Sequence, residues 1–350
     1  MNKIQEIILK IKQGSILWSD FDNLIDQNEI DEFFLHAYNL KKQNFGNNLK
    51  IYIPNKKFPA VSITGSYCAL NCEHCNKKYL DGMKGITKQE DLYNYLEDLH
   101  KREGIGALIS GGCDSEGAVP LDEYLDVINE IKQRTNLIIN THTGLINKQT
   151  AEKLGQSSVD IVSFDVNIDD AIIKDIYHLD KNENDYKKAI KLLQRYDINI
   201  VPHICIGLYY GTIKKELETI QFIKRTIKEP NLIVFIALIP PKHSNSTFKE
   251  PKPEDISKII ATARILFPKT ELSLGCMRPR GRIKVKLEKL ALKAGINRIE
   301  IPSRNSLDWV RKFDPEINFQ FFSACCAIPS KYEKIAKSKL DDLRIYQNYT

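Results

Sequence analysis

Short apolar runs alternate with amphipathic stretches along most of this 350-residue chain. Each apolar run has the length and the β-branched content of a buried strand, and the stretches between them repeat apolar residues every three to four positions, as helices do. Eight strands are predicted in this way, at residues 60–64, 105–110, 137–141, 159–166, 198–206, 232–239, 271–275 and 297–301. Strands that are apolar on both faces and separated by helices are typical of a parallel sheet.

The intervening helices carry start and stop signals. Thr87 and Glu90 form the pattern of a capping box, and a later helix that presents Ile283 and Leu287 on one face ends before Gly295, a residue that suits a C-cap. Further helices are predicted at residues 120–134, 148–154, 185–195, 214–228 and 253–267. Two or three more are expected within the first 45 residues.

Eight strand and helix units over roughly residues 58–313 predict an α/β fold of the closed (β/α)8 TIM-type barrel class, for which about 250 residues are typical. An open doubly wound sheet is the alternative. We expect an N-terminal helical cap at residues 1–57, the barrel at 58–313 and a short C-terminal extension at 314–350. Because the active site of such a barrel lies at the carboxyl ends of its strands, residues that directly follow a strand are the candidates for chemistry.

Composition narrows the class of protein. With 42% hydrophobic residues the chain can bury a large core, and it contains no run of about 18 apolar residues that would cross a membrane. Its first residues open a charged helix pattern rather than a signal peptide, so we expect a cytoplasmic protein without membrane association. The formal net charge of +6 is spread over many helix faces, which disfavours nucleic acid as a partner but suits an acidic partner protein.

Three cysteines stand within eight residues, directly after the first predicted strand. Cys68, Cys72 and Cys75 can therefore face one metal centre, and cysteines in a long chain without a signal peptide are more often metal ligands or reactive thiols than disulfides. Zinc is the alternative, because His74 lies inside the loop; a structural zinc site normally recruits a second Cys/His pair, which does not follow nearby. Three cysteines with an open fourth position favour an iron–sulfur cluster.

This three-cysteine loop at the end of the first strand of an α/β barrel resembles the signature of the radical S-adenosylmethionine superfamily. The resemblance implies a [4Fe-4S] cluster on Cys68, Cys72 and Cys75, whose unique iron chelates the amino and carboxylate groups of S-adenosylmethionine. In that family an electron from the cluster breaks a carbon–sulfur bond, and the resulting 5′-deoxyadenosyl radical abstracts hydrogen from an unreactive carbon. The cofactor carries out the difficult chemical step, and the protein binds and positions the cofactor.

The glycines after the second predicted strand are part of this resemblance. Gly111 and Gly112 resemble the family's glycine motif, in which a bare backbone approaches the methionine moiety and receives its ammonium group. Cys113 occupies the place that the family often gives to Glu, so the polar contact usually made from that position is not expected here.

The fourth and fifth predicted strands supply further cofactor residues by the same resemblance. Ser163, Asp165 and Asn167 project to one side by two-residue alternation, and the similarity to biotin synthase implies that Asp165 binds the ribose. Ile204 and Gly207 lie in a stretch that looks like the fifth-strand segment that packs against adenine.

Additional cysteines follow later strands. Cys113, Cys205 and Cys276 lie at or near strand ends, where a barrel would aim them toward its mouth, and Cys325 lies in the C-terminal extension. A single cysteine of this kind is more often a buried apolar thiol. Three at strand ends together lead to the hypothesis of a second, auxiliary [4Fe-4S] cluster, with Cys325 as the remaining candidate ligand.

Among radical enzymes, the full set of eight units, the helical cap and the segment 274–279 resemble the biotin synthase-like branch. Biotin synthase carries a cysteine after its third strand, where this chain has Asn140 and His142.

The chain is more similar to the archaeal biotin synthase-related proteins that act as two-component lipoyl synthases. That similarity implies sulfur insertion at C6 and C8 of an octanoyl chain on a lipoyl carrier protein, a second radical protein as partner and a reductant such as ferredoxin. Arg278 would receive a carboxylate or the carrier's acidic surface.

Two other functions are open at this point. A biotin synthase-like or methylornithine synthase-like enzyme would act on a small molecule, in the second case by rearranging a carbon skeleton without a sulfur donor. A zinc-bearing scaffold or carrier-binding protein would bind no S-adenosylmethionine and would show no visible absorption.

Overall fold

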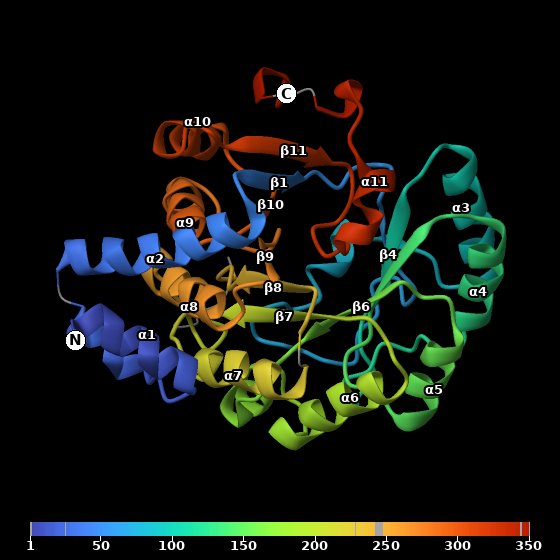
Figure 1. Ribbon diagram of the computed structural model, residues 1–350. Coiled ribbons are helices and arrows are strands. Elements are labelled where there is room, and N and C mark those ends of the chain that lie inside the picture. The colour runs from blue at the N-terminus through green and yellow to red at the C-terminus, as the bar shows by residue number, and fades with distance from the viewer. Residues whose placement is uncertain (1, 25, 228, 242–247, 344, 350) are drawn as a thin grey trace. The chain divides into compact units, whose positions relative to one another are not determined.

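The computed structural model describes residues 2–24, 26–227, 229–241, 248–343 and 345–349, and strands alternate with helices through it (Figure 1). The chain forms two compact units. Unit 1 comprises Met1–Ile51, Ile204–Gln320 and Arg344–Thr350, and unit 2 comprises Tyr52–His203 and Phe321–Leu343. One boundary falls inside the strand β7 (Ile200–Ile206), which therefore contributes residues to both units.

Unit 2 is built from parallel strands in the order β3-β2-β4-β5-β6-β7. Its strands are β2 (Ala60–Ser62), β3 (Lys84–Gly85), β4 (Gly106–Ser110), β5 (Ile138–His142), β6 (Ile161–Asp165) and the first half of β7. Its helices are α3 (Gln89–Lys101), α4 (Leu125–Arg134), α5 (Lys148–Gln156), α6 (Glu183–Arg195) and the short α11 (Glu333–Ala336), with 3-10 turns at Leu80–Gly82, Ser330–Tyr332 and Leu340–Leu343 and a π-helical turn at Ile172–Ile176.

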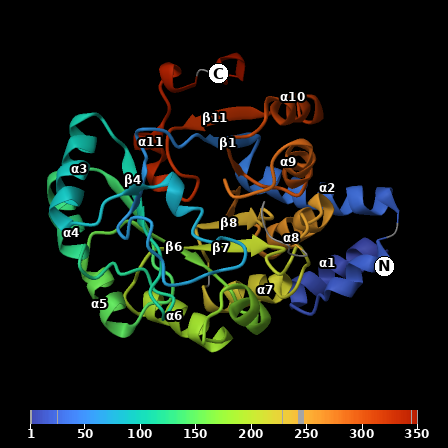
Figure 2. The same cartoon turned by 180° about the vertical axis from the view of Figure 1, so that it is seen from behind.

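The helices of unit 2 cover one side of its strands. Both views show α3, α4, α5 and α6 in a row along the outer side of the strands (Figures 1 and 2). Each helix is amphipathic and buries its apolar stripe: α4, for example, buries Leu125, Ile128 and Ile131. The other side of the strands is therefore the side on which polar residues can meet.

Unit 1 repeats the alternation of strands and helices, with the strand order β7-β8-β9-β10-β1-β11. Its strands are β1 (Asn48–Tyr52), β8 (Leu232–Ala237), β9 (Glu271–Leu274), β10 (Arg298–Glu300) and β11 (Asn318–Phe322), of which β1 and β11 end in unit 2. Its helices are α1 (Lys3–Gln13), α2 (Gln27–Phe45), α7 (Glu216–Thr226), α8 (Pro253–Leu266), α9 (Arg282–Lys293) and α10 (Arg304–Phe313), with 3-10 turns at Trp18–Asn23 and Gln347–Tyr349.

The N-terminal helices belong to the core of unit 1. Both α1 and α2 pack on α8, and α2 also contacts α9. Arg264 of α8 is fully buried beneath them and donates hydrogen bonds to the carbonyl oxygens of Gly295 at 2.9 Å and Thr270 at 2.8 Å. A buried guanidinium is tolerated only when its donors are satisfied in this way.

The structure confirms the α/β class and all eight predicted strands, each of which overlaps an observed strand. The closed eight-stranded barrel was expected, but the observed strand order has two ends, β3 and β11, and includes three strands beyond the predicted eight: β1, β3 and β11. The predicted domain boundaries at residues 57 and 313 stay a prediction. Residue 228, the predicted end of one helix, lies outside the described residues. Among the described helices, none has the length and apolar content needed to cross a membrane.

Candidate functional site

The three-cysteine loop follows β2 and is joined to the loop after β4. Thr64 links the two: its hydroxyl donates to the Tyr67 carbonyl oxygen at 2.8 Å and accepts a hydrogen bond from the Gly112 amide at 2.7 Å. The Cys113 amide donates to the Cys68 sulfur at 3.3 Å, and the Cys113 carbonyl oxygen accepts from the Ala69 amide at 2.8 Å. The loop after β2 and the loop after β4 are therefore held together around Cys68.

Gly112 is required for this contact. A Cβ atom at this position would lie 2.0 Å from the Tyr67 carbonyl oxygen and 2.5 Å from the Cys68 Cβ. No side chain fits there, because both neighbours are held by their own backbones. The glycine predicted to approach the cofactor thus also allows the cysteine loop to close on β4.

The segment after β6 holds the other side of the cysteine loop. The carbonyl oxygen of Ile176, at the end of the π-helical turn, accepts a hydrogen bond from the Glu73 amide at 2.9 Å. The next carbonyl, of Tyr177, lies 3.8 Å from the Cys72 sulfur, and His178 pairs with the Glu73 carboxylate at 2.9 Å. Residues 176–178 were not predicted as part of the site, and π-helical turns are frequent at functional sites.

The cysteine thiols are partly buried and influence one another. Burial, together with smaller contributions from the neighbouring Cys75 and Cys68, raises the pKa of the Cys72 thiol to about 12. Burial likewise raises the pKa of Cys75, and it raises that of Cys113 to about 12 with added contributions from Cys68 and Cys72. Thiols that repel as anions in this way lie close together, and a positively charged metal centre would stabilise their thiolate forms.

The polar residues of unit 2 share one face of its strands. The register places Ser62 beside Ser110, His142 beside Ser163 and Asp165 beside His203, and paired residues of parallel strands point to the same side. Sequence reasoning singled out Ser163 and Asp165 but missed His203. His203 stands out in the sequence as a histidine within an apolar strand. Its position beside Asp165, however, depends on the register between β6 and β7.

This face carries buried polar groups that lack partners. Ser163 donates to the Asn140 side-chain oxygen at 3.0 Å, which leaves the Asn140 Nδ2 atom without a hydrogen-bond partner although the residue is fully buried. Asn167 uses its side-chain oxygen to accept from the Asp169 amide, and its Nδ2 atom is likewise unpaired and buried. Unpaired buried donors are costly, so the two amides fit a face that binds a polar ligand.

Asp165 is the exposed acid on this face, with 51% of its side chain accessible. Burial by the surrounding protein acts to raise the pKa of its carboxyl, but the adjacent His142 and the further influence of His203 outweigh it and lower the pKa below its usual value. The carboxylate is therefore ionised at neutral pH and can accept hydrogen bonds from hydroxyl groups.

The residues predicted to pack against adenine belong to unit 1. Ile204 is buried, and the Gly207 amide donates to the buried Glu216 carboxylate at 2.8 Å. Gly207 has a φ of +72°, and a Cβ there would lie 2.6 Å from the Pro251 Cβ, so the turn needs glycine. The adenine contact itself stays a prediction.

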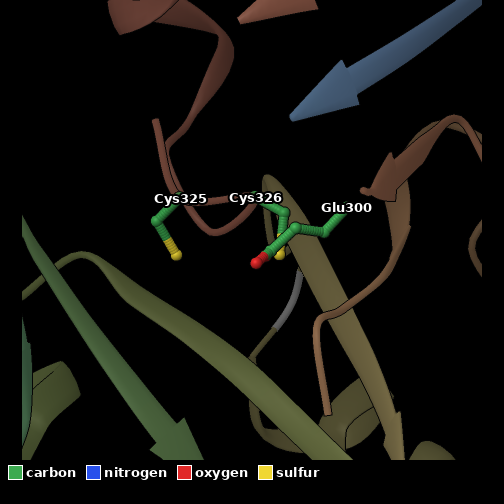
Figure 3. A group of neighbouring side chains, drawn as sticks. All are labelled: Glu300, Cys325 and Cys326. Atoms are coloured by element: carbon green, nitrogen blue, oxygen red, sulfur yellow. The ribbon is translucent and has the colours of Figure 1, made fainter. Parts of the chain in front are cut away.

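The candidate ligands of an auxiliary cluster are divided between the units. Cys113 and Cys325 lie in unit 2, while Cys205 and the exposed Cys276 lie in unit 1. Cys325 has a close neighbour that the sequence reasoning did not use: the sulfur atoms of Cys325 and Cys326 lie within 4.8 Å of each other (Figure 3). The Ala327 amide approaches the Cys325 sulfur at 3.5 Å.

Arg278 is engaged within unit 1. It is 3% exposed, and its guanidinium donates to the Glu288 carboxylate at 2.6 Å and to the carbonyl oxygens of Gly275 at 2.6 Å and Glu300 at 2.7 Å. Glu288 also accepts from the Ser303 amide at 2.8 Å. These bonds join the loop after β9 to α9 and to the end of β10, and a role of Arg278 toward substrate stays a prediction.

We expect Glu288→Ala to lower the free energy of unfolding by about 3–5 kcal/mol, because it leaves a buried guanidinium without its counter-charge. Urea unfolding followed by circular dichroism measures the change. Glu254→Ala is the matched control, since Glu254 pairs with Lys286 at the surface, where an ion pair contributes about 0–1 kcal/mol. Equal losses in the two variants would contradict a structural role for the Arg278–Glu288 pair.

The sequence is similar to a known protein family and to known biotin synthases. The profile described as "Radical SAM superfamily" matches residues 62–223. A biotin synthase from Francisella tularensis is 23% identical over 295 residues, covering 77% of this chain and 85% of that protein. A biotin synthase from Methanococcus vannielii is 20% identical over 236 residues, covering 61% and 67%.

Solved structures share the fold. The structure of HydG, a maturase of the [FeFe]-hydrogenase, has a TM-score of 0.66 at 16% identity and covers 99% of this chain and 79% of its own. That of methylornithine synthase has a TM-score of 0.55 at 15% identity, covering 84% and 85%. These similarities show the fold, and the profile match shows that residues 62–223, which include the cysteine loop after β2, are similar to the radical SAM superfamily.

Proposed function

We propose that Cys68, Cys72 and Cys75 hold the [4Fe-4S] cluster that the superfamily uses, with S-adenosylmethionine at its open iron. The observation that supports this most is the architecture of the loop. Its three thiols are partly buried, and hydrogen bonds from the β4 loop and the segment after β6 hold the loop from both sides. When bound, cluster and cofactor supply a 5′-deoxyadenosyl radical that takes hydrogen from an unactivated carbon.

The polar face of unit 2 would bind the cofactor. Gly111 and Gly112, beside the cysteine loop, would contribute backbone to the binding of the methionine part, and the ionised Asp165 carboxylate would accept hydrogen bonds from the ribose hydroxyls. Ser163 and the unpaired amide of Asn167 flank Asp165 on the same strand end. Ile204 and Gly207 would pack against adenine.

We propose sulfur insertion as the use of the radical. The similarity to biotin synthases supports it, and so does the supply of cysteines outside the first loop. An auxiliary [4Fe-4S] cluster would draw its ligands from Cys113, Cys205, Cys276 and Cys325, and the adjacent Cys326 joins this set because its sulfur lies so close to that of Cys325. Soft thiolates are the ligands that such clusters require.

The proposed substrate is an octanoyl chain on a lipoyl carrier protein, with a second radical SAM protein and a reductant such as ferredoxin as partners. A chain with a formal net charge of +6 suits an acidic carrier. Unactivated methylene and methyl carbons require a radical as reactive as this one. A hydrogen atom leaves each attacked carbon, and a carbon–sulfur bond replaces it.

The test combines the anaerobically reconstituted enzyme with S-adenosylmethionine, dithionite and an octanoylated lipoyl carrier domain, with and without a partner radical protein. We expect 5′-deoxyadenosine to form and the carrier to gain the mass of sulfur. Formation of 5′-deoxyadenosine without sulfur on this carrier would overturn the substrate assignment, and would point to a small-molecule enzyme of the biotin synthase or methylornithine synthase type. No cleavage of S-adenosylmethionine would contradict the radical chemistry itself.

A further inference from the structure

Two histidines flank Asp165 on the polar face of unit 2. His142, at the end of β5, places its Nδ1 atom 3.8 Å from the Asp165 Oδ2 atom. The rings of His142 and His203, from β7, have centroids 5.4 Å apart at an angle of 59°. Asp165 is beside His203 in the register of β6 and β7, so the carboxylate is bordered by an imidazole on each neighbouring strand.

The orientation of His203 is fixed by its own strand. Its Nδ1 atom lies 3.0 Å from the Val201 carbonyl oxygen, and because a carbonyl can only accept, this nitrogen carries the proton. His203 is 7% exposed, so its ring has little room to turn. It forms a rigid support against which the His142 ring packs.

His142 itself is more accessible, with 30% of its side chain exposed, and packing against His203 restricts its position. Its Nδ1 atom lies 3.8 Å from the Asp165 Oδ2 atom, which is an ion-pair distance longer than a hydrogen bond, while half of the Asp165 side chain remains open to a ligand. A carboxylate held from one side presents its remaining lone pairs in a fixed direction, which lowers the entropy lost on binding.

We propose that His142, supported by His203, is a positioning residue that holds the Asp165 carboxylate in the orientation in which it accepts hydrogen bonds from the ribose hydroxyls of S-adenosylmethionine. This inference rests on the proposed function, which assigns the ribose to Asp165. Neither histidine corresponds to a residue that the sequence resemblance assigned to the cofactor.

A double-mutant cycle tests the proposal on the reconstituted holoenzyme, with the dissociation constant of S-adenosylmethionine as readout. We expect His142→Phe to weaken binding about tenfold, the size of a coupling near 1.4 kcal/mol between neighbouring groups. Asp165→Ala should weaken it at least as much, and His142→Phe should add nothing in the Asp165→Ala background. His142→Asn, which keeps a donor near the position of Nδ1, should restore most of the affinity.

Two controls separate positioning from general damage. His100→Phe, on the exposed end of α3, should leave the affinity unchanged. Iron content should stay at the wild-type value in all variants, because none of them replaces a proposed cluster ligand. His203→Phe should weaken binding only while His142 is present.

The outcomes are distinguishable from a failure of the proposed function. If the wild-type holoenzyme binds no S-adenosylmethionine, the proposed function fails. If the wild type binds it and the effects of His142→Phe and Asp165→Ala simply add, or if His142→Phe loses iron, the positioning role of His142 is overturned. Non-additive effects with rescue by His142→Asn support it.

Discussion

Cys72→Ala is expected to remove the cluster of the first loop almost completely. The loop offers three thiolates, and the Cys72 sulfur also lies 3.8 Å from the Tyr177 carbonyl oxygen of the segment after β6. With two ligands left, a [4Fe-4S] cluster has no stable attachment. After anaerobic reconstitution with iron and sulfide, the variant should lose about four iron atoms per chain, the content of one such cluster, together with the matching visible absorption.

The matched control is Asn71→Ala, an exposed residue of the same loop that should keep the full iron content. The triple variant Cys68→Ala, Cys72→Ala, Cys75→Ala extends the measurement. A fall from about eight iron atoms to about four would support an auxiliary cluster, and a fall from about four to none would favour radical chemistry without a sulfur donor. Bound zinc in place of iron would contradict the assignment of the loop.

Cys325→Ala and Cys326→Ala then address the auxiliary cluster. If the pair contributes ligands, each variant should lose about four iron atoms while keeping the radical SAM cluster and its binding of S-adenosylmethionine. Iron counting with a S-adenosylmethionine binding assay separates the two clusters. Unchanged iron in both variants would exclude the pair and leave Cys113, Cys205 and Cys276 as the candidates.

The strands could be predicted because their residues are buried on both faces. Runs such as the one around Ile109 and the one around Val234 are apolar without interruption, and burial forces that composition. The strand β3 has only the residues Lys84 and Gly85, both exposed, so no local signal marks it. Pairing with β2 alone creates it.

The open strand order, in place of the expected closed barrel, could not be predicted for a related reason. Counting strand and helix units gives the number of strands, whereas the strand order depends on which edges pair. The chain supplies β1 before the predicted first strand of the sheet and β11 after the last one, and both follow β10 in the order. Their residues, such as Asn48 and Gln320, do not have the apolar composition of the central strands.

The candidate site was predictable where it is local in sequence. The spacing of the three cysteines and the alternation of Ser163 and Asp165 are short-range patterns, and the structure places both on unit 2. The support of the loop by residues 176–178 was not predictable, since it depends on a π-helical turn and on His178 in a left-handed conformation with a φ of +54°. The two histidines beside Asp165 come from strands 23 residues before and 38 residues after it, and only the register brings them together.

Gly112→Ala is expected to abolish cluster binding without replacing a ligand. The new Cβ would lie 2.0 Å from the Tyr67 carbonyl oxygen and 2.6 Å from the Cys68 Cα, so the cysteine loop must move away from β4. That movement breaks the hydrogen bond from the Cys113 amide to the Cys68 sulfur and shifts one ligand relative to the other two. Overpacking of this kind costs about 1–3 kcal/mol, which a folded domain normally tolerates, so the effect should fall on the metal centre.

Two other glycines of the same region give a graded comparison. A Cβ at Gly82 would meet nothing within 4 Å, and one at Gly111 would lie 2.9 Å from the Thr64 Oγ1 atom, a side-chain atom that can shift. We therefore expect full iron content in Gly82→Ala, partial loss in Gly111→Ala and almost complete loss in Gly112→Ala, with circular dichroism confirming that all three fold. Full iron in Gly112→Ala would mean that the cluster does not need the closed loop. Because no cysteine changes in this series, a graded loss would show that the geometry of the loop, in addition to its thiols, determines cluster binding.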